Sequence, residues 1–100
     1  MPETHTIIRG RTAIIIFSDD GEIKDVFIMD RENGYLSYRI NSDVYHMTIT
    51  LTEFAIEYEA KPGPFDSKNN IFPNWAPDGS DHKLAMNYIN EVKSRIQSLL

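Results

Sequence analysis

The chain has 100 residues, of which 41% are hydrophobic and 25% are charged, and this composition is typical of one globular domain. It contains no cysteine, which excludes disulfides, thiolate nucleophiles and cysteine-based zinc sites. The formal net charge of −5 disfavours nonspecific binding to nucleic acid or anionic membranes, and no apolar run approaches the roughly 20 residues of a membrane span.

The first two-thirds of the chain have the patterns of antiparallel strands. Arg11–Phe17 is a β-branched run followed by a Ser-Asp-Asp-Gly hairpin signal, and its unbroken apolarity predicts a central strand or one covered on both faces. Ile23–Asp30 is the next strand. Asn33 and Gly34 predict a second hairpin, because type I′ turns need positive φ at both central residues. The alternating segment Tyr35–Ile40 then forms the third strand.

The segment from Val44 to Ala60 changes its hydrophobic parity. Its apolar residues take odd positions from 45 to 51 and even positions from 54 to 58, so a single regular strand would expose half of them. We therefore expect either a bulge in one long strand or a tight hairpin near Thr52 and Glu53. On either interpretation the wetter face carries His46, Thr48, Thr50, Glu57 and Glu59.

The last element is a predicted helix from about His82 to about Leu99. Ser80 or Asp81 can cap it by accepting hydrogen bonds from the first-turn N–H groups. An apolar stripe at helical spacing predicts that the helix packs on the apolar face of the strands. The stripe consists of Ala85, Tyr88, Ile89, Val92, Ile96 and Leu99.

These elements predict a single α+β domain over residues 1–100. An antiparallel β-meander of four to five strands occupies residues 1–60, a crossover loop occupies 61–80, and one C-terminal α-helix occupies 81–100. The loop holds four of the five prolines and the single tryptophan, and loops of this length are usually functional or disordered. Its aromatic residues Phe72 and Trp75 predict either a strap that closes the core or a recognition tip, and we favour anchoring for them.

Three histidines, His5, His46 and His82, are the candidate metal ligands. They are separated by about forty and thirty-six residues and lie on three different elements, whereas metal motifs usually bring ligands close in sequence. We therefore expect three surface histidines, with no metal and no cofactor. The five glycines lie far apart and match no phosphate-binding fingerprint.

Glu57 and Glu59 are the candidate catalytic residues. They are two apart on a strand and project from the same face, where His46 could complete an acid–base pair of a small hydrolase-like enzyme. An open sheet face supplies no concave pocket by itself, and alternating acids are common on a solvated face. The sequence therefore favours a protein that is not an enzyme.

A strand meander followed by a helix is also used by proteins that bind single-stranded nucleic acid. Such proteins need exposed aromatics and a basic groove, for which Tyr35, Arg9, Arg11 and Arg39 are the candidates. The acidic net charge opposes this alternative, so nucleic acid is not the expected partner.

The leading hypothesis is a small acidic protein-binding module. By analogy of size and charge, it would act as a stoichiometric inhibitor, an immunity protein or a phage-type antagonist of a protein partner with a basic surface. We expect a cytoplasmic location, because the N-terminus lacks a secretory pattern, and a homodimer through a strand edge stays open. The predicted partner-binding residues are Asp43, Glu57, Glu59, Asp66, Lys68, Asn69, Asn70, Phe72 and Trp75.

Overall fold

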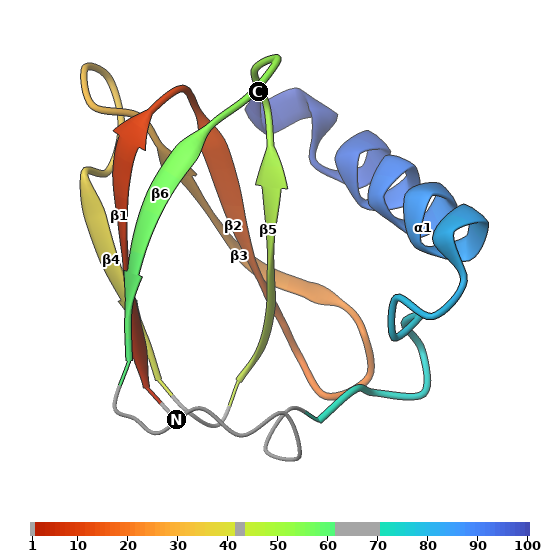
Figure 1. Ribbon diagram of the computed structural model, residues 1–100. Coiled ribbons are helices and arrows are strands. Elements are labelled where there is room, and N and C mark those ends of the chain that lie inside the picture. Colours follow the sequence, from red (N-terminus) through yellow and green to blue (C-terminus); the bar gives the residue numbers. More distant parts are fainter. Residues whose placement is uncertain (1, 42–43, 62–70) are drawn as a thin grey trace. The chain divides into compact units, whose positions relative to one another are not determined.

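The computed structural model describes residues 2–41, 44–61 and 71–100. The chain forms two compact units, Met1–Phe65 and Asp66–Leu100, of which the first contains the strands and the second contains the helices (Figure 1). In chain order the elements are β1 (Glu3–Arg9), β2 (Thr12–Phe17), β3 (Ile23–Met29), β4 (Ser37–Ile40), β5 (Tyr45–Thr50), β6 (Ile56–Ala60), α1 (His82–Arg95) and the 3₁₀ helix η2 (Gln97–Leu99).

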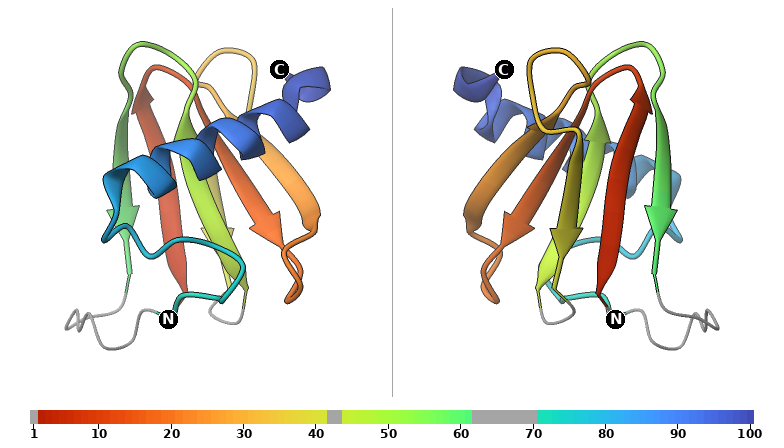
Figure 2. Two further views of the ribbon diagram at one scale, coloured as in Figure 1. Left: turned by 90° about the vertical axis from the view of Figure 1, so that its right-hand side faces the viewer. Right: turned by 90° about the vertical axis from the view of Figure 1, so that its left-hand side faces the viewer.

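The strands of the first unit form two antiparallel three-stranded sheets. Their orders are β4-β1-β6 and β3-β2-β5, so β1 and β2 are the two central strands (Figures 1 and 2). The α+β class is confirmed. The single meander is wrong, because only the connection from β2 to β3 joins neighbours in a sheet, and the other four connections change sheet. Two sheets can bury their apolar faces against each other, which a flat meander cannot do.

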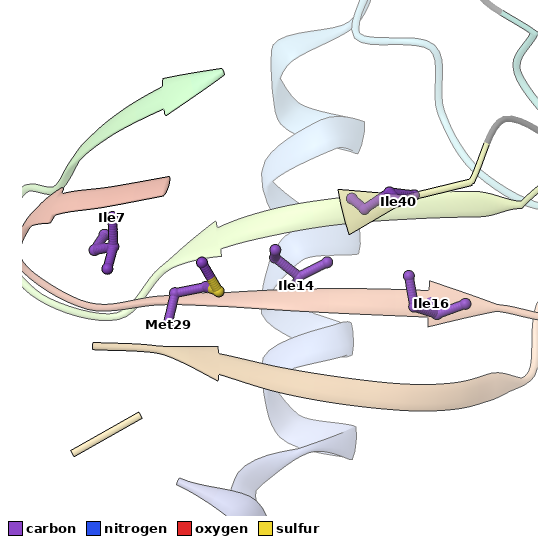
Figure 3. Packing of buried hydrophobic residues seen from close by; sticks show 5 residues of the cluster. All are labelled: Ile7, Ile14, Ile16, Met29 and Ile40. Atoms are coloured by element: carbon purple, nitrogen blue, oxygen red, sulfur yellow. The ribbon is translucent and has the colours of Figure 1, made fainter. Parts of the chain in front are cut away.

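A buried apolar cluster lies between the two sheets. It contains Ile7 from β1, Ile14 and Ile16 from β2, Met29 from β3 and Ile40 from β4, as Figure 3 shows. Burying each of these side chains stabilises the fold by about 1.5–3 kcal/mol. All six residues of β2 are buried, and β2 is the central strand of its sheet, as its apolar run predicted.

A sharp corner at Gly10 carries the chain from one central strand to the other. Gly10 has a φ of +80°, and a Cβ atom there would lie 2.5 Å from the backbone oxygen of Phe54. The Arg11 N–H donates to Thr52 Oγ1 at 3.2 Å, and the Leu51 N–H donates to the Arg11 carbonyl at 2.9 Å. The corner is therefore tied to the loop between β5 and β6, and its close packing requires glycine.

Two predicted connections have different outcomes. The hairpin after β2 is confirmed, with the Ser18 N–H donating to the Glu22 carbonyl at 2.9 Å and Gly21 at positive φ. The hairpin at Asn33-Gly34 is wrong, since β3 and β4 belong to different sheets and Gly34 does not have positive φ. Gly34 is needed for space instead, because its Cβ would lie 2.5 Å from the Ile28 carbonyl oxygen.

The parity change near Thr52 has a third explanation. Strand β5 pairs with β2, whereas β6 pairs with β1, so residues 51–55 carry the chain from one sheet to the other. The segment is neither a bulge in one strand nor a hairpin. The even-numbered position His46 of β5 and the odd-numbered position Glu57 of β6 face the space between the sheets, so the apolar positions 56 and 58 of β6 lie on the outside of their sheet.

The second unit contains the predicted helix with its predicted cap. The Asp81 carboxylate accepts hydrogen bonds from the N–H groups of Lys83 at 3.0 Å and Leu84 at 3.2 Å. The α-helix ends at Arg95, four residues before the predicted end, and the chain continues as η2. Val92 and Ile96 are buried, whereas Leu99 at the end of the predicted stripe is exposed. In the described part of the chain, no helix has the length and apolarity that a membrane span requires.

Candidate functional site

Two histidines and two glutamates meet inside the first unit and form what we call the histidine–glutamate cluster: Glu3, His5, His46 and Glu57. Strand β1 supplies Glu3 and His5, which are two residues apart and therefore point to the same face. Ile7 continues this face and belongs to the apolar cluster between the sheets. The histidine–glutamate cluster thus extends the core along β1 toward the start of the strand.

Strand register places Glu57, and the packing of the two sheets places His46, next to these residues. In the pair of β1 and β6, Glu59 lies opposite His5, and Glu57 is two residues away on the same face. In the pair of β2 and β5, His46 lies opposite Ile16, which is a core residue. Each sheet therefore contributes one imidazole to the inner space.

The carboxylate of Glu3 is the centre of the cluster. Its Oε1 atom lies 2.7 Å from His5 Nε2 and 2.6 Å from His46 Nε2. The second ring nitrogens are also engaged: His5 Nδ1 lies 3.1 Å from Glu57 Oε1, and His46 Nδ1 lies 3.4 Å from the Val44 carbonyl oxygen. The two rings are edge to face, with centroids 6.3 Å apart. All four ring nitrogens thus have an oxygen neighbour.

The cluster is shielded from water to a degree that is unusual for charged side chains. The exposed fractions of the His5, Glu3 and Glu57 side chains are 8%, 11% and 17%. Burying a polar or charged group without a partner costs several kcal/mol, so the mutual contacts within the cluster are necessary for the fold to tolerate it.

The environment of Glu3 favours its ionised form. Burial raises the pKa of the Glu3 carboxyl, but the hydrogen bonds from His5 and His46 and the charge of His46 outweigh this effect. The pKa of Glu3 therefore lies below its ordinary value. A carboxylate is the form in which Glu3 Oε1 can accept two bonds from nitrogen.

Two charged residues border the cluster. Lys61 Nζ lies 3.4 Å from Glu59 Oε1 and 3.9 Å from Glu3 Oε2, and Glu59 Oε1 lies 3.8 Å from His5 Nε2. The exposed fractions of the Glu59 and Lys61 side chains are 41% and 31%. These contacts are weaker than those inside the cluster, because partly solvated ion pairs contribute little.

The structure reverses the predicted faces of β6. Ile56 and Tyr58 were expected on the buried face and Glu57 on the wet face, but Tyr58 is 63% exposed and Glu57 points inward. The physical reason is the imidazole of His5, which gives a buried carboxylate a partner. Glu57 and Glu59 do share one face, as predicted, but Glu57 contacts His5 and not His46.

The expectation of three surface histidines is also wrong. His5 is buried and lies beside His46, whereas the exposed His82 begins α1 and does not belong to the cluster. The sequence patterns did not indicate Glu3 or the role of His5, because they predict no strand over Glu3–Arg9. The alternation of Glu3, His5 and Ile7 was the signal that could have revealed them.

Of the other predicted partner-binding residues, the structure describes only Phe72 and Trp75. Phe72 is exposed and Trp75 is half-buried in the second unit, so the tryptophan is more anchored than the phenylalanine. The remaining residues lie outside the part of the chain that the structure describes. They are Asp43, Asp66, Lys68, Asn69 and Asn70.

The opposite side of the β4-β1-β6 sheet carries exposed apolar residues. Ile8, Ile56 and Tyr58 form what we call the outer face, and Tyr58 lies opposite Thr6 of β1 in the strand register. Strand β6 is the last strand in its sheet order, so one of its backbone edges has no partner strand in the described sheet. The outer face thus combines apolar side chains with an available strand edge.

Two of the candidate nucleic-acid residues contact other side chains of the first unit. Tyr35 packs edge-on against Phe27 with ring centroids 5.5 Å apart, and Arg11 forms an ion pair with Asp30 at 3.1 Å.

Comparison with family models, with curated proteins and with solved structures found no match to this chain. A function for this chain is therefore inferred from the geometry of its own residues.

Proposed function

We propose that this chain is a small acidic, non-enzymatic module that binds a protein partner with a basic surface. The observation that carries the proposal is the outer face, where Ile8, Ile56 and Tyr58 are exposed on the paired strands β1 and β6. Contiguous exposed apolar residues on a sheet often mark protein interaction sites, and tyrosine is enriched among binding hot spots.

The reversed faces of β6 change which residues would contact the partner. Glu57 is engaged with His5, so it is not available as an exposed acid, and Tyr58 and Ile56 take the central position. The edge of β6 can pair with an extended segment of the partner, which would add main-chain hydrogen bonds to the side-chain contacts. The net charge of −5 favours the approach of a basic partner. A stoichiometric inhibitor or phage-type antagonist is the form of this function that we favour.

Capture of the partner with variant baits tests the proposal. Tyr58→Ser should weaken capture of a stoichiometric partner at least about 30-fold, because central aromatic hot spots contribute about 2 kcal/mol or more. Leu84→Ser is the matched control, since Leu84 is also an exposed large apolar residue but lies on α1. Equal capture by the Tyr58→Ser and wild-type chains, at unchanged melting temperature, would refute the role of the outer face.

An acid–base enzyme is the second candidate, because Glu57, Glu59 and His46 lie around His5 and Glu3. Separate observations favour it: Glu57 Oε1 is 3.1 Å from His5 Nδ1, and Glu59 Oε1 is 3.8 Å from His5 Nε2. Such a group could hold or move a proton. Turnover in a hydrolase substrate screen that is lost on Glu57→Gln would support the enzyme over the binding module.

A further inference from the structure

We infer that Glu3, His5 and His46 bind one divalent transition-metal cation of the zinc class. One potential ligand atom from each of these residues lies within 4.8 Å of the other two. Both Nε2 atoms approach the same carboxylate oxygen, Glu3 Oε1, at 2.7 and 2.6 Å. Two imidazoles and one carboxylate form a frequent ligand set for such ions.

The neighbours of the Nδ1 atoms prepare both rings for this role. His5 Nδ1 faces the Glu57 carboxylate at 3.1 Å, and His46 Nδ1 faces the Val44 carbonyl at 3.4 Å. Both neighbours are acceptors, so each suits a hydrogen on Nδ1, and Nε2 is the atom through which each ring could bind a metal once its hydrogen bond to Glu3 is given up. Histidine ligands in metal sites commonly donate their second N–H to a carboxylate or carbonyl in this way.

The centre of the cluster needs positive charge. If both Nδ1 atoms carry hydrogens, two neutral rings would direct their Nε2 lone pairs at Glu3 Oε1 over less than 3 Å, so the hydrogen bonds to Glu3 need one further proton on each ring. Two additional protons or one divalent cation can occupy this space, and both supply two positive charges. The cation has an advantage in a buried site, because it is bound by all three groups at once.

Only a small rearrangement would admit the ion. Metal–ligand distances near 2.0–2.1 Å at tetrahedral angles place neighbouring ligand atoms about 3.3 Å apart, so each contact must open by about 0.7 Å. His46 is the most exposed member of the three, and its ring lies on a strand at the edge of its sheet. Rotation of this side chain and of Glu3 can provide the opening.

The ligand types also select the class of ion. Mg²⁺ and Ca²⁺ prefer oxygen ligands, whereas imidazole nitrogen suits zinc and neighbouring transition metals. Three protein ligands leave a fourth position for water or for another group. Lys61, whose Nζ lies 3.9 Å from Glu3 Oε2, opposes the added charge, while Glu57 and Glu59 offset it.

Titration of the untagged chain with Co²⁺ and Zn²⁺ tests the inference. After treatment with a chelator, the wild-type chain should bind one ion, seen as visible Co²⁺ absorption that Zn²⁺ abolishes. His46→Gln and Glu3→Gln should each weaken binding at least about tenfold, and Glu57→Gln should weaken it about 10- to 100-fold through its contact with His5. His82→Gln is the matched control and should bind as the wild type does, because His82 lies outside the cluster.

Nitrogen NMR of the wild-type chain keeps the test independent of whether the variants fold. Zn²⁺ should shift the Nε2 signals of His5 and His46 while leaving those of His82 unchanged. The inference is overturned if the wild-type chain binds neither ion at millimolar concentration. It is equally overturned if His82→Gln loses as much affinity as His46→Gln, or if Nε2 of both cluster histidines stays protonated in excess Zn²⁺.

Discussion

The corner at Gly10 allows a quantitative prediction, because two separate effects would destabilise a variant with a side chain there: the left-handed backbone conformation and the close contact of the new Cβ. Gly10→Ala places a side chain at a φ of +80°, and the left-handed conformation costs an L-residue about 1–2 kcal/mol. The new Cβ would also lie 2.5 Å from the Phe54 carbonyl oxygen, which accepts a hydrogen bond from Thr52 Oγ1. Moving that oxygen breaks a bond that contributes about 0.5–1.5 kcal/mol. We expect a total loss of about 1.5–3.5 kcal/mol.

Gly79→Ala separates the cost of the backbone conformation from the cost of the close contact. Gly79 has a φ of +91°, but its Cβ would meet no atom within 4 Å, so this variant should lose only the conformational contribution of about 1–2 kcal/mol. Urea unfolding followed by far-UV circular dichroism would give both free energies of unfolding. Equal losses in the two variants would refute the argument that close packing at the corner between β1 and β2 requires glycine.

Two further predictions concern local contacts. Asp81→Ala should destabilise α1 by about 1 kcal/mol, because the carboxylate caps the N–H groups of Lys83 and Leu84. Thermal unfolding measures this loss, and an unchanged midpoint would contradict the role of the cap. The hydrogen bond from Ser18 lowers the pKa of Asp20 below its ordinary value in the folded chain. Ionised Asp20 therefore stabilises the folded state at pH values above its unfolded-state pKa. This stabilisation is lost as the pH falls through the folded-state pKa. An NMR titration should show the low pKa and its return toward the ordinary value in Ser18→Ala, and a pKa that Ser18→Ala leaves unchanged would refute the contact.

Sequence patterns predicted the features that depend on neighbouring residues. The hairpin around Gly21 and the cap at Asp81 each need a few residues close in the chain, and both are present. The apolar run at Arg11–Phe17 predicted the strand that the structure has at Thr12–Phe17. The Asn33-Gly34 signal is equally local, yet it misled, because the strands on either side of it join different sheets.

The candidate metal site could not be predicted in this way. His46 is 43 residues from Glu3, and Glu57 is 52 residues from His5, so only the register of β1 with β6 and the packing of the two sheets bring them together. The pattern of β6 was misleading for a related reason. Hydrophobicity assigned Ile56 and Tyr58 to the core, but the His5 imidazole on β1 gives Glu57 a partner on the inner face and leaves the apolar residues outside.

The most direct measurement is anomalous X-ray diffraction at the zinc absorption edge from crystals of the chain grown with Zn²⁺. The proposed site predicts one strong peak about 2.0–2.2 Å from Glu3 Oε1, His5 Nε2 and His46 Nε2, with Glu57 still at His5 Nδ1. Full-occupancy zinc elsewhere, for example at His82, with no peak between the three ligands, would contradict it.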